Sequence, residues 1–145
     1  MRKVLVSLLC TMGLTLVAHA ADFGTAGEAK AMLEKAVVAV KADKAAALEK
    51  FTKGTDGFKD RDLYPFCGGP DGNFSAHPSL VGKSLKDLKD KAGKAFGEEL
   101  YKTAAVGTVG EVSYMWPRPG SDAPVEKHAF VTKVDDQVCV VGYYK

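Results

Sequence analysis

The sequence is poor in the residues that most enzymes use for chemistry. Its 145 residues include three cysteines, three histidines and one tryptophan. The histidines belong to no HExxH sequence or other metal-spaced cluster, and no GxSxG sequence is present, so the common zinc-enzyme and serine-hydrolase motifs are missing. There is no Cys-x-x-Cys pair either, which argues against thiol redox chemistry and covalent haem. We therefore expect no catalytic residue, no metal site and no cofactor.

An excess of one charge is also missing. The chain has 20 lysine and arginine residues against 18 aspartate and glutamate residues. Arg2 and Lys3 lie in an N-terminal segment that we expect to be removed, and the remaining chain is then formally neutral. Proteins that bind phosphate backbones carry a one-sided field of lysine and arginine. Nucleic acid is therefore not an expected partner.

Long apolar runs are confined to the N-terminus. Arg2 and Lys3 precede the apolar segment 4–17, and Ala18-His19-Ala20 has the small-x-small pattern that signal peptidase reads. We predict a signal peptide over residues 1–20 and one exported domain over residues 21–145, in the periplasm or secreted; an uncleaved anchor is the alternative. No later run approaches the ~20 apolar residues that a membrane span needs.

Two helical segments are predicted after the leader. Thr25 and Glu28 form a capping box, and apolar residues then recur at helical spacing at Leu33, Val37 and Val40. The pattern loses phase near residues 42–43, and a second helical piece ends at Gly54, as a C-cap glycine would end it. The charged residues around the break are expected to form a solvated face.

Five strands are predicted in the rest of the chain, over residues 63–67, 73–77, 110–116, 125–134 and 138–144. The turn residues 68–72 make the first two a hairpin, and Pro65 indicates an edge position, a bulge or a late start to the pairing. Between the second and third strands we expect a capped helical turn at 84–88 and a helix from Phe96 to near Gly107, lying across the sheet. The layout is an α+β domain with segregated helices.

The mature chain keeps two cysteines, Cys67 and Cys139, because Cys10 leaves with the leader. Both lie in strand-like runs. Two cysteines in an oxidising compartment form a disulfide more often than they stay as free thiols. If the two strands are neighbours, the bridge closes a loop of about 72 residues and stabilises the fold by roughly 4 kcal/mol.

Strand alternation indicates a small pocket. Tyr114 and Trp116 share one face of their strand with Val112, and Lys127 shares a face of the next strand with Ala129, Val131 and Lys133. A site for a small anion needs apolar walls and one or two cations or hydroxyls. The candidate ligand-binding residues are Tyr114, Trp116, Lys127, His77 and Lys133.

Each candidate also has a purely structural interpretation. Lys127 could extend its ammonium to solvent, His77 before Pro78 could shape a loop, and Trp116 could end a strand at the edge of the core. Tyr64 and Tyr143 are assigned to the core rather than to the ligand. A bulge in the strands would also invert the faces on which the lysines lie.

Several short motifs, in this order and at these spacings, resemble the extracytoplasmic single Cache domain, type 2, found alone in small secreted proteins. The resemblance covers roughly residues 28–145 and is carried by Leu63-Tyr64, Asp71-Gly72, His77-Pro78, Leu80-Val81-Gly82-Lys83, Asp87-Leu88-Lys89-Asp90, Gly93-Lys94 with Phe96, Tyr114-x-Trp116-Pro117-x-Pro119, Lys127 and Gly142-x-Tyr144-Lys145. Relatives usually have an apolar residue where Cys67 lies, and the same is expected at Cys139. Two departures that are both cysteine favour the disulfide.

The resemblance implies a PAS-like five-stranded antiparallel sheet behind a long N-terminal helix, with a small-molecule pocket between the sheet and the crossing segments. In that family the ligands are often short carboxylates such as acetate, propionate or pyruvate. The chain is then a periplasmic sensory domain that binds a small organic acid and relays through a membrane sensor kinase or chemoreceptor. The alternative is an interaction module that docks onto a membrane sensor or self-associates, with its pocket filled by its own side chains.

Overall fold

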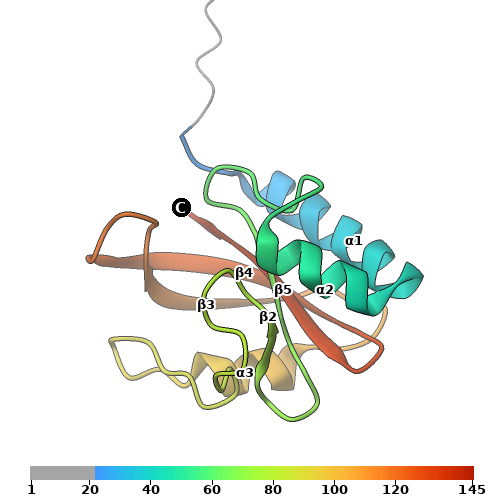
Figure 1. Cartoon of the computed structure of the whole chain (residues 1–145). Helices are drawn as coiled ribbons and strands as arrows, with labels where there is room; N and C mark the ends of the chain where they lie inside the picture. Colours follow the sequence, from blue (N-terminus) through green and yellow to red (C-terminus); the bar gives the residue numbers. More distant parts are fainter. Residues whose placement is uncertain (1–21) are drawn as a thin grey trace, which may run out of the picture.

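A computed structural model describes residues 22–145, so the predicted signal peptide lies outside the described residues. Five strands form one sheet in the order β2-β1-β5-β4-β3, and every neighbouring pair is antiparallel. The elements in chain order are α1 (Ala26–Ala42), α2 (Lys44–Lys53), β1 (Pro65–Gly68), β2 (Phe74–Ala76), α3 (Phe96–Thr103), β3 (Gly110–Pro117), β4 (Pro124–Val134) and β5 (Gln137–Tyr144) (Figure 1). This confirms the α+β class and the five-stranded antiparallel sheet.

The helix boundaries follow from the predicted caps. The amide of Glu28 donates to Thr25 Oγ1, and the amide of Thr25 donates to Glu28 Oε2 at 2.8 Å, which completes the capping box at the start of α1. Asp43 ends α1 and also caps α2, because its Oδ1 accepts from the amide of Ala46 at 3.1 Å. Gly54 ends α2 with a φ of 67°, a left-handed conformation that glycine adopts without strain.

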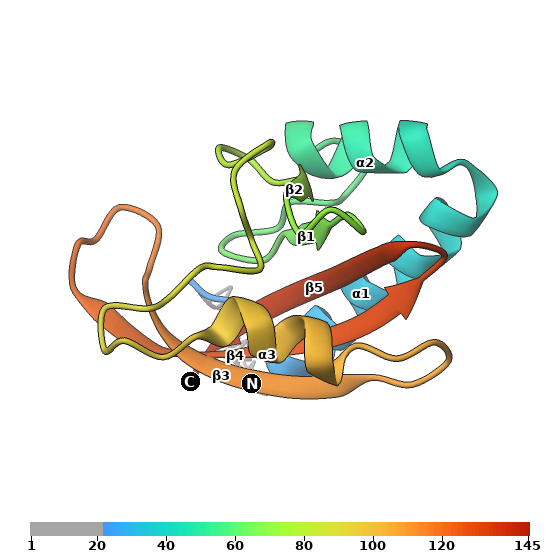
Figure 2. The same cartoon turned by 90° about the horizontal axis from the view of Figure 1, so that it is seen from below.

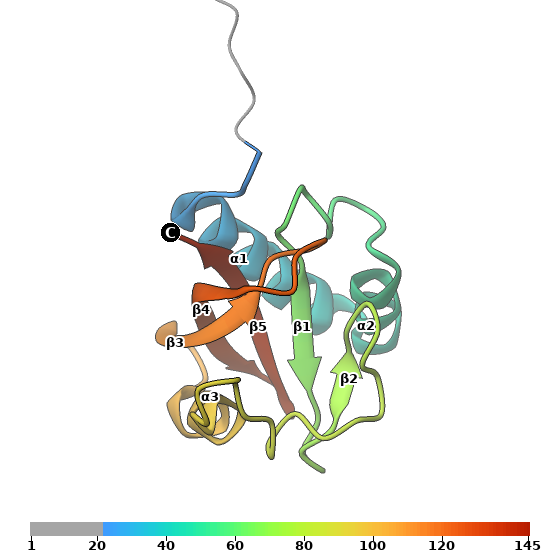
Figure 3. The same cartoon turned by 90° about the vertical axis from the view of Figure 1, so that its left-hand side faces the viewer.

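The sheet has a helix-covered face and a second face that carries α3. Helices α1 and α2 pack on the first, and α3 packs across β3 and β4 on the second (Figure 2). The central strand β5 is buried along its whole length. Its side chains alternate between the two cores: Cys139, Val141 and Tyr143 face α1, whereas Val138 and Val140 face the α3 side. Figure 3 shows the short strands β1 and β2 beside β5, with α2 next to them.

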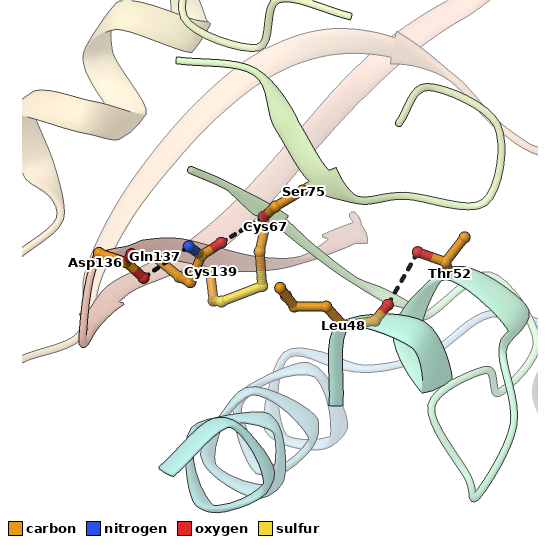
Figure 4. The surroundings of a disulfide bond; sticks show 7 residues. All are labelled: Leu48, Thr52, Cys67, Ser75, Asp136, Gln137 and Cys139. Atoms are coloured by element: carbon orange, nitrogen blue, oxygen red, sulfur yellow. Dashed lines mark hydrogen bonds between the residues drawn. A yellow bond between two sulfur atoms is a disulfide. The ribbon is translucent and has the colours of Figure 1, made fainter. Parts of the chain in front are cut away.

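The predicted disulfide joins Cys67 of β1 to Cys139 of β5. The two residues lie directly opposite each other in the β1–β5 pairing, with their Cα atoms 4.2 Å apart. Both are fully buried, and Leu48 of α2 packs against the same core (Figure 4). The bridge therefore fastens β1 to the central strand on the face that α1 and α2 cover.

Helix α3 ends at Thr103, before the predicted end near Gly107, and the structure decides two other local details. Pro65 pairs with β5, whereas the pairing of β1 with β2 begins only at Cys67, so the late start is the correct one of the three options for this proline. The segment 84–88 is a capped turn, as predicted: the amide of Asp87 donates to Ser84 Oγ at 3.2 Å, and the amides of Leu85 and Lys86 both donate to the carbonyl of Gly72. The crossing segment thus contains one helix, α3, preceded by an irregular loop.

Candidate ligand-binding site

Three adjacent strands place a lysine between two tyrosines on the α3 face of the sheet. In the strand register Tyr114 of β3 lies opposite Lys127 of β4, and Lys127 lies opposite Tyr144 of β5. Directly opposed residues of an antiparallel pair project to the same face. Lys127 is therefore at the centre of a row of three side chains.

Lys127 is buried, with 2% of its surface exposed. Its Nζ lies 5.0 Å from the ring centroid of Tyr64 and 5.0 Å from that of Tyr144. Within residues 22–145 this ammonium forms no ion pair and no hydrogen bond. Burial lowers the pKa of Lys127 to about 8, and the charge of Asp62 opposes that shift. A buried charge without an ion-pair partner is costly. An ammonium in this state is expected at a site that receives an anion.

The ammonium faces a small cavity of about 10 Å³, room for about one water molecule. Its apolar walls come from β1, β2, the irregular loop, α3 and β3, and consist of Phe66, Phe74, Leu80, Leu88, Phe96 and Trp116. The Phe96 ring stacks on Tyr114 at 4.0 Å between centroids, with an interplanar angle of 9°. It also meets the Trp116 ring edge-on at 5.7 Å.

His77 contributes a hydrogen-bond donor to this cavity. The amide of Ser79 donates to His77 Nδ1 at 3.0 Å, so the neutral ring carries its hydrogen on Nε2. Burial, with the nearby charge of Lys127, lowers the pKa of His77 to about 4. The imidazole is therefore neutral at pH 7 and offers an N–H.

Two tyrosine hydroxyls complete the polar lining. Tyr64 and Tyr114 line the cavity, and neither hydroxyl hydrogen-bonds to another residue in the described part of the chain. Burial raises the pKa of both phenols, so both stay protonated at neutral pH. Together with the ammonium and the imidazole N–H, these groups can donate hydrogen bonds to one acceptor-rich group, and a carboxylate is such a group.

Gly142 provides the space in which the lysine stem lies. A Cβ atom at this position would come within 2.4 Å of Lys127 Cε and 3.3 Å of the carbonyl oxygen of His128. Gly142 lies opposite Ala129, diagonal to Lys127 in the β4–β5 register. Because Gly142 has no side chain, the stem of Lys127 can cross β5 toward the cavity.

Comparison with known families matches residues 23–144 to the single Cache domain 2 model. The chain belongs to this family. In sequence it is 34% identical over 56 residues to the methyl-accepting chemotaxis protein McpP of Pseudomonas putida, a match that covers 39% of this chain and 10% of that receptor. The chain thus spans about a tenth of the length of this curated relative.

Solved structures of chemotaxis sensor domains have the same fold. A methyl-accepting chemotaxis protein from Vibrio parahaemolyticus superposes with a TM-score of 0.66 and 29% identity, over 81% of this chain and 86% of that chain. A periplasmic sensor domain of a chemotaxis protein superposes with a TM-score of 0.60 and 27% identity, over 81% of this chain and 88% of that chain. A Cache chemosensory domain described for carboxylic acid recognition superposes with a TM-score of 0.57 and 25% identity, over 81% of this chain and 86% of that chain.

Four of the five candidate residues of this Cache domain line one cavity: Tyr114, Trp116, Lys127 and His77. Lys133 does not join them. It lies six residues farther along β4, is exposed, and pairs with Val106 at the far end of the strand. Alternation places it on the correct face, but six residues of strand are about 20 Å.

Sequence reasoning missed several residues of the site. Tyr64, which had been assigned to the core, places its ring next to the Lys127 ammonium. Asp62 is buried; its Oδ1 accepts from the amide of Gly24 at 2.6 Å, and its charge acts on Lys127. Tyr143, by contrast, belongs to the opposite core, as predicted. Asp62 and Tyr64 precede β1 in an irregular segment, so periodicity could not place them beside Lys127.

The second histidine of the described residues lies away from the cavity. His128 lies on the helix-covered face, where its Nδ1 is 3.0 Å from Glu111 Oε1. Among residues 22–145, no group of three histidine, cysteine, aspartate or glutamate side chains could hold a metal ion. None of the helices in this part of the chain has the length and apolar character needed to cross a bilayer.

Proposed function

We propose that this Cache domain is a periplasmic sensory domain that binds a small organic acid, with the acid's carboxylate beside Lys127. In this proposal residues 1–20 are a signal peptide, residues 21–145 are the exported domain, and the signal passes to a membrane sensor kinase or chemoreceptor. The family match and the chemotaxis relatives support the sensory role. The relative described for carboxylic acid recognition supports the ligand class.

The observation that carries the proposal is the buried Lys127 ammonium without a carboxylate partner in the described chain. Tyr64, Tyr114 and His77 line the cavity beside it and can supply further donors. A carboxylate that binds there acquires a charge-assisted hydrogen bond, which is stronger than one between neutral groups. It also neutralises a charge that burial has made costly.

The test is thermal unfolding in the presence of acetate, propionate and pyruvate, each compared with its neutral amide. A ligand at 100 times its Kd stabilises the fold by about 2.7 kcal/mol, which raises the Tm by about 10 °C for a domain of this size. We expect the acids to shift the Tm, the amides to leave it unchanged, and Lys127→Met to abolish the shift. Lys133→Met is the matched control, because Lys133 lies on the same strand outside the cavity. Equal shifts with the amides, or unchanged shifts in Lys127→Met, would refute the proposal.

One observation favours a second function. The cavity has room for about one water molecule, because the domain's own side chains fill the rest of the space. A domain with a self-filled pocket would act as an interaction module that docks onto a membrane sensor or onto a second copy. Sedimentation measurements would then show a stable complex or dimer, with no Tm shift from any acid.

A further inference from the structure

An open groove lies directly outside the small cavity. It has a volume of about 410 Å³, compared with about 10 Å³ for the cavity. The two hollows share Tyr64, His77, Leu80 and Trp116. These four residues therefore form the partition between the buried donors and the groove.

Lys59 and Arg61 line part of the groove, and the rest of its outer wall is suited to an apolar group. It includes Pro78, Pro117 and Pro119, which have no amide hydrogen to donate. The indole of Trp116 and the ring of Tyr144 add aromatic surface. Residues of the β3–β4 connection and of the segment leading into β1 line the groove.

The cavity beside Lys127 is too small for a whole organic acid. Even acetate has four heavy atoms, and the cavity has room for about one water molecule. A carboxylate placed against the ammonium must therefore send its carbon chain past the partition. The groove is the open space that adjoins that partition.

We infer that the outer groove is the second half of the ligand site, and that the ligand is a monocarboxylic acid whose apolar chain or ring extends from Lys127 into it. This inference rests on the proposed function, because it assumes that the carboxylate binds at Lys127. It adds a requirement for size: the preferred acid is longer than a two-carbon or three-carbon acid. The groove supplies contact area for the chain, and the cavity supplies the donors for the carboxylate.

The test is a titration series by calorimetry with unbranched acids from acetate to hexanoate. Each methylene that leaves water for an apolar surface is expected to tighten binding by about fourfold. Ser79→Trp is the variant that narrows the groove, since Ser79 is exposed and lines the groove but not the cavity. Ala45→Trp is the matched control, an equally exposed position on α2.

In the wild type and in Ala45→Trp, we expect affinity to rise with chain length. In Ser79→Trp the gain per methylene should fall to near onefold. An unchanged gain in Ser79→Trp would overturn the inference. A wild type that binds acetate through Lys127 as tightly as hexanoate would also overturn it, while the proposed function would stand. If no acid binds, or if Lys127→Met binds every acid as well as the wild type, the proposed function fails and this inference fails with it.

Discussion

Replacing Lys127 with methionine should make the ligand-free domain more stable. The substitution removes the buried positive charge and keeps an unbranched apolar stem. Burial lowers the pKa of this lysine from 10.5 to about 8, and each pKa unit corresponds to about 1.4 kcal/mol. The charged form therefore costs the folded state about 3 kcal/mol at pH 7. The two tyrosine rings beside the ammonium return about 1 kcal/mol, so the expected gain is about 2 kcal/mol.

The gain should depend on pH in a defined direction. The unfolded lysine keeps its proton up to about pH 10.4, whereas the folded lysine loses it near pH 8. Between these values the unfolded chain binds more protons, so the stability of the wild type rises with pH relative to Lys127→Met. The difference should be constant below pH 8 and disappear near pH 10.5. Burial raises the pKa values of Tyr64, Tyr114 and Tyr144, so these phenols do not add a transition in the lower part of that window.

The measurement is urea unfolding of the ligand-free wild type and Lys127→Met at several pH values from 6.5 to 10.5. A gain of about 2 kcal/mol corresponds to a rise of about 8 °C in Tm at pH 7. Lys133→Met serves as the control, and as an exposed substitution it should change stability by less than about 0.5 kcal/mol. A Lys127→Met domain that is less stable than the wild type at pH 7, or a difference that does not change with pH, would refute the reasoning.

Two further predictions follow from the packing. Gly142→Ala should displace the Lys127 stem, because the new Cβ would lie 2.4 Å from Lys127 Cε. We expect carboxylate binding, measured by calorimetry, to weaken roughly tenfold. Gly27→Ala is the control: a Cβ there meets open space, and binding should not change. Replacing both Cys67 and Cys139 with alanine should cost about 4 kcal/mol, from a closed loop of 72 residues. The Tm of this double variant should therefore fall by about 15 °C in calorimetric scans. A fall of less than about 5 °C would contradict the estimate.

The parts of the fold set by local chemistry were predictable from sequence. The capping box at Thr25, the glycine cap at Gly54 and the strand periods depend on neighbours a few residues away, and the structure confirms them. The disulfide was predictable for a different reason, since only two cysteines, Cys67 and Cys139, follow the predicted signal peptide. The cap of the 84–88 turn was also predictable, but the bonds from its amides to the carbonyl of Gly72 were not, because a local pattern does not contain contacts between segments.

The candidate site was predictable only where strand alternation applies. Alternation placed Tyr114 and Lys127 on one face, and the strand register places them side by side. The same rule included Lys133, because a period of two gives the face of a strand and not the distance along it. Tyr64 and Asp62 lie before β1 in an irregular segment, so their approach to Lys127 depends on how the chain folds back over the sheet.

The energies indicate why an ammonium occupies this position. An apolar residue at 127 would make the fold more stable by about 2 kcal/mol on the estimate above, so stability alone does not explain the lysine. A residue that lowers stability at the centre of a donor-lined cavity is what the proposed carboxylate site would require. On the opposite face, the Cys67–Cys139 bridge contributes about 4 kcal/mol, more than the lysine removes. In the proposed function, the disulfide therefore offsets the cost of keeping a buried charge for a carboxylate.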